Sequence, residues 1–155
     1  MADKYHLSVL RQGVNAWNLK RTSEAREPDL FRRELGFPEL AKTDLGSLTL
    51  SGINLSNADL IECDLTRTDL SGAILIRCQF AGANLTEANL SGADLTNALL
   101  PDTRCVGTNF RHAILRGVQF GSSDLSYADF SHADMIGVDL SEANTRGAKF
   151  DGTMK

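Results

Sequence analysis

Residues 90–95 read Leu-Ser-Gly-Ala-Asp-Leu, and the five-residue pattern in this stretch repeats along most of the chain. From Leu45 to Phe150 every fifth residue is nearly always Leu or Phe, through 22 pentapeptides without an insertion. Of these 22 residues, 14 are Leu and 5 are Phe. The exceptions are Cys105, Met135 and Thr145. A period of five fits neither an α-helix nor a half-buried β-strand, so the pattern predicts a repeat architecture.

The repeat at residues 93–97 defines five positions. These are the small position (Ala93), the Asp/Asn position (Asp94), the central position (Leu95), and the first and second corner positions (Thr96 and Asn97). Four repeats make one square coil of twenty residues, with the central and small side chains inside. Residues twenty apart then stack in columns with a spacing of about 4.8 Å, and five and a half coils give a rod of about 26 Å.

This pattern resembles the pentapeptide repeat family, whose consensus is Ala-(Asp/Asn)-Leu followed by two variable residues. The resemblance covers about 110 of the 155 residues. It implies an all-β solenoid, namely a right-handed quadrilateral β-helix. Residues 10–18 and 28–30 also resemble the N-terminal helix of cyanobacterial members, which implies a cyanobacterial source.

The segment before the repeats is predicted to form an N-terminal α-helical cap. Leu7, Leu10, Val14 and Trp17 recur at helical spacing within residues 4–25. We expect this helix to cover the open end of the rod, with Trp17 as a core anchor and not a binding aromatic.

The predicted domain organisation follows from where the regular repeats begin and end. Arg33 falls at a small position, so we expect a distorted first coil or a short helix within residues 29–42. Residues 1–42 then form the cap and lead-in, 43–152 the β-helix, and 153–155 a tail.

Charge and hydropathy exclude several classes of function. The formal net charge is −4, divided into +2 for residues 1–42, −7 for residues 43–152 and +1 for Lys155. An acidic rod argues against nucleic-acid binding, which needs a basic stripe. The sequence has no apolar run long enough for a membrane helix and no apolar region of a signal peptide, so we expect no membrane association and a cytoplasmic location.

Nothing in the sequence indicates a cofactor, a metal or a catalytic residue. Cys63, Cys78 and Cys105 are predicted to point inward as small buried hydrophobes, too far apart for a disulfide. His112 and His132 should stack on one outer corner; a metal-binding pair is the alternative, but two surface ligands make a weak site.

The acidic residues are interpreted as part of the turns. Asp or Asn recurs in every coil at an outward position, where short polar side chains support the backbone. They do not converge on one cleft, so we predict that the protein is not an enzyme.

Departures from a polar exterior indicate a partner-binding patch. Isoleucines point outward on one face, with arginines at its edge and Asp94 and Thr96 between them. The predicted patch comprises Ile74, Ile76, Arg77, Ile114, Arg116 and Ile136. Exposed apolar clusters often mark partner sites, although scattered surface isoleucines are the alternative.

Two further features break the regular pattern. Arg104, Val106, Arg111 and Arg116 form a locally basic belt in the acidic rod, and residues 101–105 match the consensus least, which predicts an irregular corner. At the C-terminal end, the exposed edge of the last coil predicts an end-to-end homodimer; the alternative is that the edge is tolerated because Asp151 and Lys155 discourage further stacking.

The favoured function is a non-enzymatic module that binds an unidentified protein partner. The family resemblance supplies one alternative, a DNA mimic that inhibits or modulates a type II topoisomerase. The seven basic residues that interrupt the rod weaken this alternative.

Overall fold

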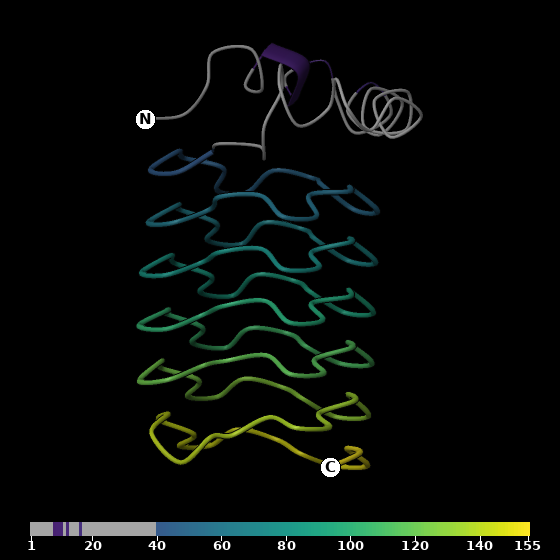
Figure 1. Ribbon diagram of the computed structural model, residues 1–155, viewed down its shortest axis with the longest axis vertical. Helices are drawn as coiled ribbons and strands as arrows, with labels where there is room; N and C mark the ends of the chain where they lie inside the picture. Colours follow the sequence, from purple (N-terminus) through teal and green to yellow (C-terminus); the bar gives the residue numbers. More distant parts are fainter. Residues whose placement is uncertain (1–7, 11, 13–15, 17–39) are drawn as a thin grey trace.

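The computed structural model describes residues 8–10, 12, 16 and 40–155. From residue 40 onward the chain winds into a stack of flat coils along the long axis of the molecule (Figure 1). Residues 8–10 and 16 are helical, and Leu10 is buried in the same hydrophobic cluster as the rod. These few residues do not support the predicted α-helical cap. The rest of the predicted helix, Trp17 and the lead-in to residue 39 lie outside the described residues.

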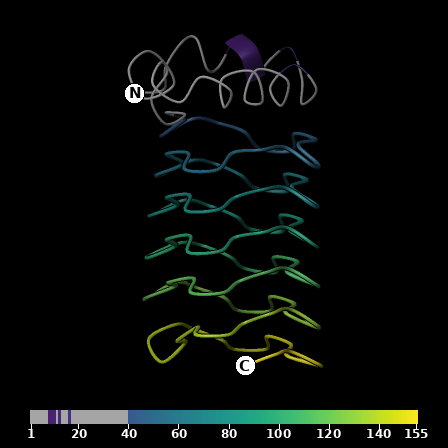
Figure 2. The ribbon, with the colours of Figure 1, turned by 45° about the vertical axis from the view of Figure 1, so that its right-hand side comes forward.

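The chain pairs with itself at a separation of twenty residues. Parallel β-bridges join the Asp/Asn positions of successive coils, from Asp44–Asp64 to Asp134–Met154. The amide of Leu45, for example, donates to the carbonyl of Asp64 at 2.8 Å. A bridge at every fifth residue and a separation of twenty give four faces to each coil, as predicted. Figure 2 shows the same stack from a second side.

The β-structure consists of isolated bridges within residues 40–155, without extended strands. The prediction of an all-β solenoid is therefore corrected in this respect. Each face is one pentapeptide long, and its corner residues belong to a turn. Too few residues remain on a face for a continuous ladder.

The corners are β-turns with a left-handed residue at the second corner position. The amide of Ile53 donates to the carbonyl of Leu50 at 3.1 Å, which closes one such turn. A positive φ at the third residue is the feature of a type II turn. Gly92 adopts it at 66° without a steric cost, but Glu87 adopts it too, at 57°. In a non-glycine residue this conformation costs about 1–3 kcal/mol, so it persists only where neighbouring coils impose it.

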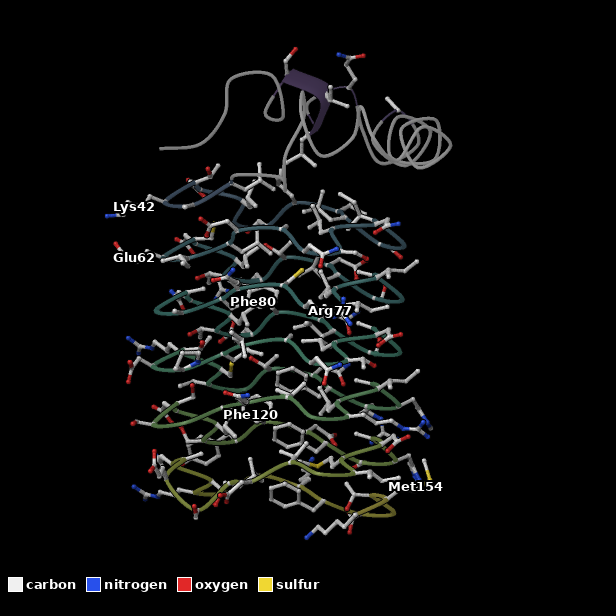
Figure 3. All side chains as sticks on the ribbon, in the orientation of Figure 1. Lys42, Glu62, Arg77, Phe80, Phe120 and Met154 are labelled. Carbon is white, nitrogen blue, oxygen red and sulfur yellow. The ribbon has the colours of Figure 1, made fainter. Side chains whose placement is uncertain are left out.

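The central side chains fill the rod. Every central residue from Leu40 to Met135 is at most 4% exposed. This result confirms the inward orientation predicted from the five-residue period. Figure 3 labels Phe80 and Phe120 within the stack.

The C-terminal half of the core contains an aromatic stack. The rings of Phe110 and Phe130 are parallel with centroids 4.9 Å apart, and Phe150 continues the stack at 5.2 Å. Phe120 meets both Phe110 and Phe130 edge-on, at 6.1 and 6.0 Å. Both arrangements are favoured geometries for aromatic pairs.

Polar residues at the small positions donate hydrogen bonds to the coil before them. The hydroxyl of Thr108 donates to the carbonyl of Leu85, 23 residues earlier, at 2.7 Å. The thiol of Cys78 donates in the same way to Leu55 at 2.8 Å. The prediction that the cysteines are only buried hydrophobes was therefore incomplete, because the thiols of Cys63 and Cys78 also donate to core carbonyls.

One corner of the stack lacks the usual hydrogen bond that closes the turn. The amide of Thr103 does not close a turn with Leu100; it donates instead to the hydroxyl of Ser123 at 2.8 Å, and that hydroxyl donates to the carbonyl of Leu100. In the next coil, Gly121 has a positive φ of 50° in place of Ser122. The predicted irregular corner at residues 101–105 is therefore confirmed.

The two coils that follow separate at the same corner. The amide of Leu100 donates to the carbonyl of Gln119 at 2.8 Å. Gln119 and Asp139 still form a parallel bridge, but within residues 40–155 the equivalent bond from Phe120 to Asp139 falls outside ordinary hydrogen-bond geometry. Figure 1 shows this as a yellow loop at the lower left that swings away from the stack. Lys42 and Glu62, labelled in Figure 3, mark the same corner at the opposite end.

The last coil is only partly covered. Leu140, Thr145 and Phe150 are half-buried, unlike the central residues before them. Among the described residues, the amides of Thr145 and Phe150 have no backbone partner. The ammonium of Lys155 lies 5.5 Å from the centroid of the Phe150 ring. The end of the rod thus presents apolar side chains and free backbone groups together.

Candidate interaction surface

The predicted isoleucine face, which comprises Ile74, Ile76, Ile114 and Ile136, points away from the core. Ile74 and Ile114 are 39% and 38% exposed, and Ile136 is 48% exposed. Ile76 is half-buried. The outward orientation predicted for these side chains is therefore present at all four positions.

The isoleucines do not form one continuous apolar patch. Consecutive bridges join Ile74 to Asp94, Asp94 to Ile114 and Ile114 to Asp134, so an acidic residue separates each apolar one. Met154 continues the column and is 52% exposed. The sequence analysis did not include Met154, although its twenty-residue spacing from Asp134 was the available signal. Figure 3 labels Met154 near the C-terminal end of this face.

The two arginines at the edge of the face differ in their partners. Arg77 is exposed and forms no ion pair with any residue in the described part of the chain. The Nε of Arg116 lies 2.5 Å from a carboxylate oxygen of Asp134, whose side chain is only 8% exposed. Arg77 is thus the edge residue that can pair with a partner without breaking an existing contact.

The basic belt lies against a ring of aspartates in the following coil. This aspartate ring comprises Asp124, Asp129, Asp134 and Asp139, one on each face. Arg111 pairs with Asp129 at 3.3 Å, as Arg116 does with Asp134. The basic belt is therefore largely neutralised within the protein.

Asp124 and Asp139 complete the ring in different ways. The pKa of Asp124 is lowered, first by hydrogen bonds from Ser126 and also by the charge of Arg104, its bridge partner. The pKa of Asp139 is lowered by hydrogen bonds from Ser141. Within residues 40–155, Asp139 forms no ion pair.

A surface hollow lies beside Asp139, where the two coils separate. Its volume is about 250 Å³. We call it the corner hollow; it is lined by Val118, Phe120, Gly121, Asp139, Ser141 and Glu142, among others. Sequence reasoning did not find this feature, because it depends on the weakened backbone pairing between Gln119 and Asp139.

The two histidines stack as predicted but are not arranged to share a metal ion. The rings of His112 and His132 have centroids 5.1 Å apart and planes inclined by only 9°. An imidazole binds a metal in its own plane, and two such nearly parallel planes do not meet at one ion. Within the described residues, no group of three His, Cys, Asp or Glu side chains fits a metal.

The three cysteines are buried and no disulfide joins them to one another, as predicted. Burial raises the pKa of the Cys63 thiol to about 11, and it also raises the pKa of Cys105. A thiol must ionise to act as a nucleophile or a metal ligand, so Cys63 and Cys105 have a structural role at neutral pH.

The Asp and Asn residues support the turns, as the sequence predicted. A carboxylate oxygen of Asp64 accepts hydrogen bonds from the hydroxyl and the amide of Thr66, at 2.6 and 2.9 Å. These bonds lower the pKa of Asp64. Asn84 bonds to Thr86 in the same way. The same arrangement recurs from coil to coil, which is the signature of a structural role.

Comparison with protein families identifies the repeat. The model for pentapeptide repeats matches eight copies, over residues 39–75, 63–102, 78–117 and 103–142. The chain belongs to the pentapeptide repeat family. Members of this family are generally non-catalytic.

Solved structures of pentapeptide repeat proteins resemble this one. A pentapeptide repeat protein from the Arabidopsis thaliana thylakoid lumen is 29% identical, with a TM-score of 0.64, over 66% of this chain and 72% of that one. Rfr23 from the cyanobacterium Cyanothece 51142 is 25% identical over 83% of this chain and 98% of its own, with a TM-score of 0.32.

A third resemblance is to HetL, which is involved in heterocyst differentiation regulation in the cyanobacterium Nostoc sp. strain PCC 7120. It is 26% identical over 77% of this chain and 73% of its own, with a TM-score of 0.28. No curated protein sequence matches the chain. The pentapeptide repeat fold implies a right-handed quadrilateral β-helix for the coils of residues 40–155.

In the part of the chain that the structure describes, no helix has the length and hydropathy needed to span a bilayer.

Proposed function

We propose that this pentapeptide repeat protein is a non-enzymatic module that binds a protein partner through its isoleucine face. The supporting observation is that the interior is filled while large apolar side chains lie outside. Central residues to Met135 are at most 4% exposed, whereas Ile74, Ile114 and Ile136 are 38–48% exposed. A filled core leaves only the outer faces for recognition, and exposed apolar residues rimmed by polar groups are typical of partner sites.

Arg77 and Arg116 give this face a mixed apolar and basic character. The guanidinium of Arg77 is free of ion pairs among the described residues, and arginine is enriched at interface cores. The partner surface that best complements the face is a flat one with apolar residues spaced to meet alternate coils. Acidic groups on it would meet Arg77.

The test is capture of partners from a lysate of the source cells by the immobilised protein, with identification by mass spectrometry. The variant Ile74→Ser/Ile114→Ser should lose the partner that the natural protein captures. Leu99→Ser is the matched control, because Leu99 is 36% exposed in a different column. Equal capture by the natural protein and the double variant would remove the isoleucine face from the proposal.

We also propose that two copies associate end to end through the last coil. The half-buried Leu140, Thr145 and Phe150 and the unpaired amides there would find partners in a second copy. Phe150→Asp should then yield a monomer in analytical ultracentrifugation. A natural protein that is already monomeric at tens of micromolar would contradict the dimer.

The alternative, DNA mimicry toward a type II topoisomerase, has a direct test. Ion pairs with the basic belt occupy Asp129 and Asp134, which leaves fewer free carboxylates along the rod. We expect no change in gyrase supercoiling at micromolar protein.

The cytoplasmic location stays a proposal, which fractionation of source cells would test.

A further inference from the structure

The last coil, residues 136–155, leaves a regular row of unpaired backbone groups at the end of the stack (Figure 1). On three of its faces the central residue has an amide without a backbone acceptor within residues 40–155, namely Leu140, Thr145 and Phe150. On the same faces the small residue has a carbonyl without a backbone donor in that range, namely Val138, Ala143 and Ala148. Each face thus presents one free carbonyl and one free amide, two residues apart.

This row of groups is complementary to itself about a two-fold axis. In an antiparallel pair of strands, two residues that face each other without bonding are flanked on either side by an amide-to-carbonyl bond. If the axis passes through the face of Asn144, the amide of Thr145 meets the carbonyl of Ala143 in the second copy, and the reverse. The amides of Leu140 and Phe150 meet the remaining free carbonyls in the same way.

The charged residues of the last coil fall opposite their counterions about this axis. Asp139 and Lys149 each lie five residues from Asn144, and Glu142 and Arg146 each lie two residues from it. All four charged side chains are exposed, and none forms an ion pair within residues 40–155. Opposite charges directly across antiparallel strands are stabilising, and like charges there are destabilising. The axis therefore creates two Asp139–Lys149 pairs and two Glu142–Arg146 pairs between the copies.

Neighbouring positions of the axis bring like charges together. A shift by one corner places Glu142 beside the Glu142 of the second copy, and a shift by one corner in the other direction does the same for Arg146. A shift by one face places either Asp139 or Lys149 directly opposite itself. The free backbone groups recur on each face, so they allow several of these registers. The charges are what distinguish the register centred on Asn144.

We propose that a second copy docks on the last coil with its two-fold axis through the face of Asn144, and that the Asp139–Lys149 and Glu142–Arg146 pairs fix this register. The inference rests on the end-to-end association proposed above and specifies its geometry. Inside the junction, Phe150 would meet Val138 of the second copy, and both side chains are already partly buried against the core. The core would then continue from one rod into the other.

The test is a charge-reversal series, with dissociation constants from analytical ultracentrifugation at low ionic strength. Asp139→Lys and Lys149→Asp each place like charges opposite at two sites. Each variant should raise the dissociation constant of its own dimer at least about tenfold. Both coils should keep their fold, because Arg104 and Lys149 already place a cation at an Asp/Asn position and Asp is its usual occupant.

Mixing the two variants makes the test specific for the register. A heterodimer of Asp139→Lys with Lys149→Asp has opposite charges at both sites, so it should form with about the natural dissociation constant. The combined variant Asp139→Lys/Lys149→Asp should recover its homodimer for the same reason. Asp151→Lys is the matched control on the same coil. It lies opposite the uncharged Gly137 in this register, so dimerisation should be unchanged.

The possible failures of the register and of the dimer are distinguishable. A natural protein that is monomeric at tens of micromolar overturns both. A natural dimer that tolerates both single reversals, shows no preference for the heterodimer, or is weakened only by Asp151→Lys overturns the register and leaves end-to-end association in place. None of these results bears on the isoleucine face.

Discussion

Two corners of the same pair of coils differ in how they close. At one, the amide of Phe110 donates to the carbonyl of Asp129 at 2.8 Å, and Asp129 donates back to Thr108 at 2.9 Å. At the other, a bridge still joins Gln119 to Asp139, but within the described residues the equivalent bonds of Phe120 and Asp139 fall outside ordinary hydrogen-bond geometry. Both corners have a Phe at the central position and an Asp in the following coil. A regular repeat therefore fixes which residues face each other without guaranteeing that their backbones bond.

The turn from Leu100 to Thr103, in the coil before, also differs from the other turns. The hydroxyl of Ser123 lies between Leu100 and Thr103 and replaces the turn bond that their backbones would form. In the next coil Gly121 takes the left-handed conformation in place of Ser122. At Thr108 the equivalent bond to the carbonyl of Leu85 leaves the turn closed, so what distinguishes the corner at Leu100 is that the amide of Thr103 bonds to the side chain of Ser123.

The largest expected effect is the loss of stability when a phenylalanine is removed, and it should differ between the two corners. Phe130→Ala removes a ring stacked on both sides by Phe110 and Phe150, and should cost about 3–5 kcal/mol in free energy of unfolding. Phe120→Ala should cost less, because the open corner allows its surroundings to collapse into the cavity. Urea denaturation measures both, and equal losses would show that the open corner is as rigid as the closed one.

The next effect concerns the hydroxyl groups. Ser123→Ala leaves the buried amide of Thr103 without its partner and should cost about 1–3 kcal/mol. Thr108→Val removes one bond to the carbonyl of Leu85, which keeps the amide of Ala88, so its cost should be about 1 kcal/mol. If Ser123→Ala instead stabilises the protein and slows hydrogen exchange at the amide of Phe120, this would contradict the prediction and show that the corner closes without the hydroxyl.

Hydrogen exchange should separate the corners without a substitution. The amides of Phe120 and Asp139 should exchange about tenfold faster or more than those of Phe110 and Asp129, which have backbone partners. Native-state exchange followed by NMR gives the rates residue by residue. Similar protection at all four amides would mean that ordered water or another group closes the open corner.

The smallest effect is on acid stability. The pKa of Asp124 is lowered by Ser126, Asn144 and Arg104, so its contribution to stability is complete above about pH 4 and is lost as the pH falls through the lowered value. The pKa of Asp139 is lowered only by hydrogen bonds from Ser141. Asp124→Asn should therefore flatten the decrease in stability between about pH 5 and pH 2 more than Asp139→Asn does. Urea midpoints at several pH values test this order.

The part of the fold that follows from the period was predictable. An apolar residue at every fifth position requires an inner column, and the central residues to Met135 are buried accordingly. The turn role of the Asp/Asn position was predictable for the same reason, since one local geometry recurs in each repeat. At the ends of the rod the five-residue period predicts burial less well. Leu48, at a small position in the first described coil, is 42% exposed.

The open corner could not be predicted from the period. The sequence Gly121-Ser122-Ser123 fits the repeat as well as the other corners do. Only the structure of the preceding coil shows that the hydroxyl of Ser123 lies between Leu100 and Thr103. The pairing of the basic belt was missed for a related reason. Arg111 and Arg116 were identified, but their aspartates lie in the following coil, 18 residues on, at a spacing that no single repeat reveals.

The bridges at a constant separation of twenty residues have a consequence for how such a surface changes during evolution. Because each pentapeptide turns the chain through about 90°, inserting one repeat would keep the core intact and rotate everything after it by one face. Inserting four would lengthen the rod and restore every orientation. The angle between the isoleucine face and the corner hollow is therefore encoded as a number of repeats, and small insertions or deletions can reset it without new contacts.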